Sequence, residues 1–125
     1  MDPPALPPAA ALKAAQRLID DGHAFAAHEV LEAVWKSDPG PERALWRGLA
    51  QLAVGITHRD RGNLRGATSL LARGGDTLSP YAEQQPHGVP VAQLRAWATS
   101  AAADPAAAAP MPRLTGRSQA ADERA

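Results

Sequence analysis

Apolar residues recur every three or four positions in five segments of the chain, which is the spacing of one face of an α-helix. Glycine, proline and asparagine separate these segments at Gly22, Pro41 and Gly62–Asn63, where helices commonly end or begin. The pattern predicts helices over residues 9–21, 24–36, 41–61 and 64–78 and a short helix ending near residue 101. No segment shows the alternation of a strand. We therefore expect an all-α fold, an orthogonal or antiparallel bundle of four main helices plus a short C-terminal helix.

The composition divides the chain into three parts. Residues 1–8 contain four prolines and form an entry segment. Residues 9–101 carry the helical pattern and form a single helical domain. Residues 102–125 consist largely of alanine, proline and small polar residues, which offer little to bury, so we expect a disordered tail.

The second predicted helix contains the most unusual pattern, FAAHEVLEAVW. At about 3.6 residues per turn, Phe25, His28, Glu32 and Trp35 stack along one side of the helix. The two aromatic residues predict that this row is buried. Because unpaired ionisable groups are costly to bury, His28 and Glu32 would need partners from the rest of the chain.

The third predicted helix offers such partners beside its core stripe of Leu45, Leu49, Leu52 and Ile56. Gln51 and His58 lie in a second row, about 120° around the helix from this stripe. Gly48 and Gly55 accompany them, although glycine inside a helix costs about 1 kcal/mol relative to alanine. We therefore expect a close helix contact or a ligand at these glycines.

If the second and third helices pack side by side, their polar rows would meet in one pocket. Trp35 and Trp46 would be its walls, and its polar lining would be His28, Glu29, Glu32, Gln51 and His58. The candidate ligand-binding residues are therefore His28, Glu32, Trp35, Gln51 and His58.

The chemistry of such a pocket stays open between four interpretations. The groups could form a structural hydrogen-bond network or bind a small ligand or partner peptide. A divalent metal is the third alternative, with a hydrolase-like enzyme built on His28, Glu32 and His58 and with Glu29 as base or fourth ligand. The fourth is metal-free acid–base catalysis by Glu32 and His28, so Glu29 and Glu32 are the candidate catalytic residues. The HExxE motif lacks the second histidine of the HExxH zinc proteases, so that mechanism does not transfer.

These motifs resemble a known family. Its pattern is a Phe-x-x-His-Glu-x-x-Glu-x-x-Trp helix, a Gly-Leu-x-Gln-x-Ala helix ending in histidine, an Arg-Gly-Asn joint and a Gly-Ala helix. The matching positions here are Phe25, His28, Glu29, Glu32, Trp35, Gly48, Leu49, Gln51, Ala53, His58, Arg61, Gly62, Asn63, Gly66 and Ala67. The chain is similar, over about residues 12 to 95, to the bacterial and archaeal "domain of unknown function 309" family. The resemblance implies a small all-helical, cytoplasmic domain and supplies no activity.

The composition of the chain limits the kinds of partner that we expect the protein to bind. Lys and Arg together number 13, as do Asp and Glu, and this balance argues against general nucleic-acid binding and gives no polybasic cue for a membrane. The chain has no cysteine, which is compatible with the cytoplasm, and no apolar run long enough to span a membrane. Trp46 and Trp97 could mark the surface of a homodimer or a protein partner. We expect an uncharacterised small soluble helical domain with an interior His/Glu/Gln site, and whether it is an enzyme stays open.

Overall fold

The computed structural model describes residues 5–115 of the chain and contains five α-helices within them. Their bounds are α1 Pro8–Asp20, α2 Ala24–Ser37, α3 Arg43–Asp60, α4 Leu64–Leu78 and α5 Val91–Ala103. Short 3-10 turns lie at Ser79–Tyr81, Pro86–Gly88 and Pro105–Ala107, and no strand occurs in the described range. The predicted all-α fold is confirmed.

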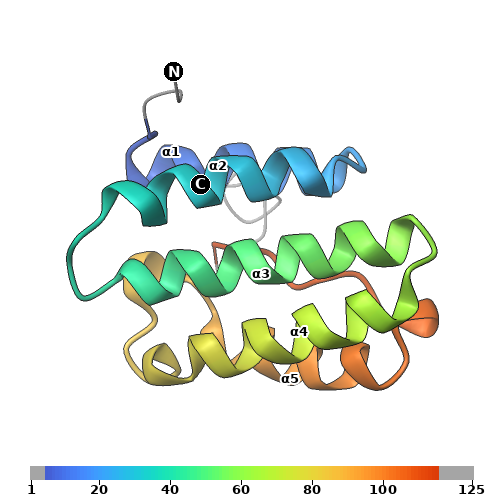
Figure 1. The fold of residues 1–125 in the computed structure, drawn as a ribbon. Helices are drawn as coiled ribbons and strands as arrows, with labels where there is room; N and C mark the ends of the chain where they lie inside the picture. Colours follow the sequence, from blue (N-terminus) through green and yellow to red (C-terminus); the bar gives the residue numbers. More distant parts are fainter. Residues whose placement is uncertain (1–4, 116–125) are drawn as a thin grey trace, which may run out of the picture.

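The helices stack in three layers, with α1 beside α2, α3 alone in the middle, and α4 beside α5 (Figure 1). Each helix packs mainly on the next one along the chain. Short joints make α1 to α4 antiparallel neighbours, whereas α5 follows α4 after a longer segment with two 3-10 turns. As a consequence α1 and α5 stand on the same side of α3 without forming a main packing pair. None of the helices described is long and apolar enough to cross a membrane.

Local signals in the sequence set the helix ends. Gly22 and Gly62 adopt the left-handed backbone, with φ of +84° and +81°, and terminate α1 and α3. Asn63 caps α4, since its Oδ1 accepts a hydrogen bond of 3.0 Å from the N–H of Gly66. The predicted start at Pro41 is wrong by two residues, because residues 39–42 form a turn in which the N–H of Gly40 donates to Oδ1 of Asp38.

The contact between α3 and α4 depends on glycines from both helices. A Cβ atom built on Gly55 would lie 2.8 Å from the side chain of Leu71, and one on Gly48 would lie 2.8 Å from Leu78. Gly74 of α4 is equally close to Leu52 of α3, at 2.7 Å. The close helix contact predicted from the glycines of α3 is therefore present, and it is made with α4.

Trp46 and Trp97 are both buried and do not mark a dimer surface. Trp46 belongs to the central core, and the indole Nε1 of Trp97 donates to the carbonyl of Ala109. The core around them is largely leucine and spans all five helices, with fully buried leucines at Leu12, Leu31, Leu45, Leu49, Leu52, Leu71, Leu78, Leu94 and Leu114.

The predicted disordered tail begins too early, because residues 102 and 103 form the end of α5, and the segment that follows α5 is also packed on the molecule. Residues 105–107 form a 3-10 turn, and the chain then returns across the molecule to α1, where Leu114 is buried in the core. Composition gave no sign of this packing because its hydrogen bonds use main-chain groups of the segment, at Ala109 and Leu114. The rest of the predicted tail, and residues 1–4 of the predicted entry segment, lie outside the described residues.

Candidate functional site

Phe25, His28, Glu32 and Trp35, here called the α2 row, run along one side of α2 at the edge that it shares with α3. The arc of α2 that is buried consists instead of Ala24, Ala27, Leu31 and Val34. The α2 row is only partly covered, and Phe25 remains 46% exposed. The prediction that the row is buried is therefore wrong: α1 and α3 pack on α2 and cover the smaller aliphatic side chains.

Glu32 occupies the middle of the row and contacts a basic side chain one turn away on either side. Its Oε2 lies 3.3 Å from Nε2 of His28, and its Oε1 lies 3.3 Å from Nζ of Lys36. Because a carboxylate can only accept, Nε2 of His28 carries the proton in this contact. The other ring nitrogen of His28, Nδ1, is buried and has no hydrogen-bond partner in the described part of the chain.

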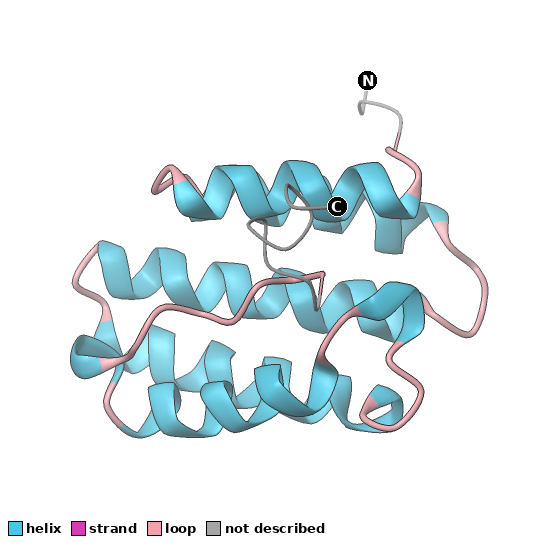
Figure 2. Cartoon of the chain, turned by 180° about the vertical axis from the view of Figure 1, so that it is seen from behind, coloured by secondary structure: helices cyan, strands magenta, loops and turns pink. Residues whose placement is uncertain are grey.

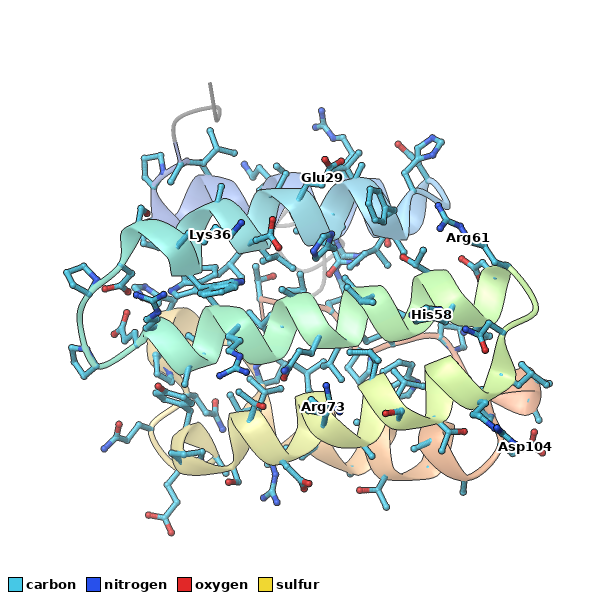
Figure 3. All side chains as sticks on the ribbon, viewed as in Figure 1. Glu29, Lys36, His58, Arg61, Arg73 and Asp104 are labelled. Atoms are coloured by element: carbon cyan, nitrogen blue, oxygen red, sulfur yellow. The ribbon has the colours of Figure 1, made fainter. Side chains whose placement is uncertain are left out.

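Two arginines from the ends of α3 cover the aromatic ends of the row. The guanidinium of Arg61 lies 5.4 Å from the ring centre of Phe25, and that of Arg43 lies 5.1 Å from the ring centre of Trp35. This follows from the antiparallel hairpin, which places the start of α2 beside the end of α3. Each such cation–π contact is worth about 0.5–1 kcal/mol at an exposed site. Figure 3 shows Arg61 and Lys36 at opposite ends of this edge.

Gln51 and His58 do not join the α2 row, and the predicted five-residue pocket does not form. Oε1 of Gln51 accepts a 2.7 Å hydrogen bond from the hydroxyl of Thr77, on α4. Nδ1 of His58 accepts from the side-chain amide of Asn63 at 3.0 Å, and His58 lies against Gly66 of α4. These two residues share the side of α3 that carries Gly48 and Gly55, and α4 covers that side.

Two further predicted residues also lie apart. Glu29 is exposed, and Figure 3 shows it pointing away from α3. Trp46 is in the core and cannot be a wall beside the α2 row; its ring centre lies 5.7 Å from that of His87. Of the predicted site, the structure therefore brings together His28, Glu32 and Trp35, which share the α2 row with Phe25.

The proposed metal ligands are not assembled by this arrangement. Within residues 5–115 no three histidine, cysteine, aspartate or glutamate side chains are close enough to hold a metal ion together. His28 and Glu32 are adjacent, whereas His58 is engaged at the joint between α3 and α4. The residues present do not fit the predicted two-histidine, one-carboxylate set.

Arg43, Arg61 and Lys36 were missed as parts of this site. Arg61 entered the sequence motifs only through the Arg-Gly-Asn joint, with no link to Phe25. The signal that could have identified the two arginines is the short joint between the second and third predicted helices. An antiparallel hairpin with that joint places position 25 beside position 61 and position 35 beside position 43.

The comparisons with known proteins agree with the motifs. A family model described as "Domain of unknown function (DUF309)" matches residues 12–70. The curated "Uncharacterized protein YpuF" of Bacillus subtilis (strain 168) is 47% identical over 49 residues, which cover 38% of this chain and 28% of that relative. The match thus spans less than a third of the relative's length, and no solved structure matches the chain. The helix motifs of α2, α3 and the start of α4 all lie within residues 12–70, and their resemblance to this family of unknown function is confirmed.

Proposed function

We propose that this domain is a non-enzymatic protein-binding module and that the α2 row is its contact surface. The observation that carries the proposal is the exposure of Phe25, a residue that is 46% exposed and whose ring lies between Arg61 and His28. A half-exposed aromatic ring flanked by arginine is typical of the residues that contribute most to protein–protein binding.

The row is held in position before any partner binds. Arg61 and the imidazole of His28, at 5.2 Å between ring centres, both contact Phe25, and Arg43 lies over Trp35. Side chains that are already fixed lose less conformational entropy on binding. Because its side chains are already fixed, we expect the row to bind a structured surface with all of its side chains together.

The charge on Glu32 also suits a surface that becomes covered. The carboxylate is 34% exposed and already lies between His28 and Lys36. Covering a paired carboxylate costs less than covering an isolated one, because its hydrogen bonds persist in the complex. We therefore expect the partner to pack on the aromatic rings and to leave these internal pairs in place.

A protein partner, which includes a second copy of this chain, is also favoured by the charge of the chain. Equal numbers of basic and acidic residues, 13 each, support neither nucleic acid nor an anionic membrane as the ligand. We place the domain in the cytoplasm, a proposal that the cysteine-free sequence and the family resemblance support.

The experiment compares Phe25→Asp with Leu64→Asp, a matched control because Leu64 is 43% exposed at the start of α4. The unchanged chain and the two variants are each tagged and expressed in the natural host, and the proteins that bind to them are quantified. Each candidate partner is then purified and titrated against all three chains. We expect Phe25→Asp to weaken the affinity of the partner by at least about 30-fold, the effect of losing a major contact residue. Leu64→Asp should leave it within about threefold, as expected for a residue outside the interface.

Two results contradict the proposal. One is the absence of any purified partner whose affinity depends on Phe25. The other is an equal loss of affinity in both variants, which would indicate a general effect of surface charge.

A further inference from the structure

The returning segment, residues 108–114, is here called the strap. It leaves the 3-10 turn after α5 and crosses the back of the molecule behind α3, between α5 and α1 (Figure 2). Ala108 already has an extended backbone, with φ of −63° and ψ of 137°. The strap therefore lies on the side of the stack that α1 and α5 leave open between them.

Side chains of the two flanking helices bind the main chain of the strap. The indole N–H of Trp97, on α5, donates to the carbonyl of Ala109 at 2.7 Å. Oε1 of Gln16, on α1, accepts from the N–H of Leu114 at 2.8 Å. Hydrogen bonds from buried side chains to an extended main chain are the means by which peptide-binding grooves hold their ligands.

Gln16 is fixed in the orientation that this contact needs. The residue is buried on α1, and its amide donates to Oδ1 of Asp20 at 2.8 Å, which leaves Oε1 free for the strap. Oδ2 of the same Asp20 lies 3.5 Å from Nη1 of Arg113. One face of α1 thus binds both the main chain and the basic side chain of the strap.

The strap has the chemistry of an extended peptide ligand. Its sequence Pro-Met-Pro-Arg-Leu places two prolines around Met111, and proline restricts the chain to extended conformations without offering an N–H. Leu114 is the anchor, with 1% of its surface exposed, and Met111 packs on the core less completely. The contacts of the strap fit an extended segment that ends in a basic residue and leucine.

We propose that the face between α1 and α5 is a binding groove for an extended Pro-x-Pro-Arg-Leu segment, occupied by the strap of the same chain and able to exchange it for an added peptide of that chemistry. The contacts of this groove come from α1 and α5, which carry no residue of the α2 row, so the proposal does not depend on the function of that row.

Two features of the strap favour exchange over permanent packing. Only one of its side chains, that of Leu114, is fully buried, and its other contacts are two main-chain hydrogen bonds, a partly exposed ion pair and the partly buried Ala108 and Met111. In addition, Nε of Arg113 is buried without a hydrogen-bond partner in the described part of the chain, so the fit of the strap is incomplete. A segment tethered by a short linker competes at an effective concentration in the millimolar range, which an added peptide can match.

The experiment uses the full chain and a labelled synthetic peptide with the sequence of residues 104–115. In the Leu114→Asp chain the strap loses its anchor, so we expect saturable one-to-one peptide binding at least about tenfold tighter than to the unchanged chain. A peptide carrying Leu114→Asp should not bind. Trp97→Phe in the Leu114→Asp chain removes the indole donor and should weaken the peptide at least about fivefold.

A second measurement does not depend on the folding of any variant. In the unchanged chain labelled with nitrogen-15, millimolar unlabelled peptide should displace the strap and change the amide signals of Leu114 and of the Trp97 indole together. Absence of any such change would overturn the proposal. Equal peptide affinity in the unchanged chain and in a folded Leu114→Asp chain would also overturn it, because the strap would then not occupy the groove.

Discussion

Glu32 links two basic side chains of α2, one turn before it and one turn after it. Pairs of this kind on a helix surface, with glutamate preceding lysine by four residues, contribute about 0.2–0.5 kcal/mol each. The side chain of His28 is 17% exposed and that of Glu32 is 34% exposed, so water screens much of their interaction. The HExxE motif therefore contributes a series of side-chain contacts along a partly exposed side of α2.

We therefore predict that Glu32→Gln lowers the free energy of unfolding by less than about 1 kcal/mol, measured by urea denaturation. Glu29→Gln, three positions before Glu32 on α2 and exposed, is the matched control for loss of a negative charge. A loss of about 3 kcal/mol or more in Glu32→Gln alone would show a buried network and contradict this geometry.

Single residues also show which features of the site could be predicted from the sequence and which could not. The adjacency of His28 and Glu32 was predictable because it follows from helical spacing alone. The exposure of Phe25 was not, because it depends on which side of α2 is covered by α1 and α3. The side of α3 that carries Gln51 was assigned to α2 for the same reason, although α4 covers it.

At the scale of the element, the helices themselves were predictable to within about two residues, since glycine and asparagine at their ends act locally. The glycines inside α3 indicated a close neighbour but not its identity. The partner is α4, where Leu71 and Leu78 fill the space above Gly55 and Gly48. A glycine inside a helix, where its propensity is low, thus indicates close packing. Which neighbouring helix makes that contact is known only from the fold.

We predict that Gly55→Ala destabilises the protein by about 1–2 kcal/mol, because overpacking outweighs the gain in helix propensity. The new Cβ would lie 2.8 Å from the side chain of Leu71 and 3.2 Å from its backbone nitrogen, which cannot move aside cheaply. Gly75→Ala is the control, since its Cβ would lie 3.4 Å from that of Ala98, an ordinary contact. Thermal unfolding should show Gly75→Ala unchanged or stabilised, and stabilisation by Gly55→Ala would contradict the packing described.

In the whole molecule, each helix packs mainly on the next one along the chain. As a result α4 covers one side of α3 and the strap covers another. Composition predicted disorder where the strap lies, because alanine and proline give little apolar area. The strap is placed by hydrogen bonds from Gln16 and Trp97 to its main chain and by Leu114. Contacts to main-chain groups leave little trace in a sequence, so this part of the fold was not predictable from it.

We infer that the α2 row is free to bind a partner because it contributes little to folding. Urea denaturation of Phe25→Ala beside Leu31→Ala tests this inference, since Leu31→Ala removes a fully buried side chain from the adjoining arc of α2. We expect the free energy of unfolding to fall by about 1 kcal/mol or less in Phe25→Ala and by about 2–5 kcal/mol in Leu31→Ala. A loss for Phe25→Ala as large as that for Leu31→Ala would place Phe25 in the core and contradict a role for the α2 row as a free surface.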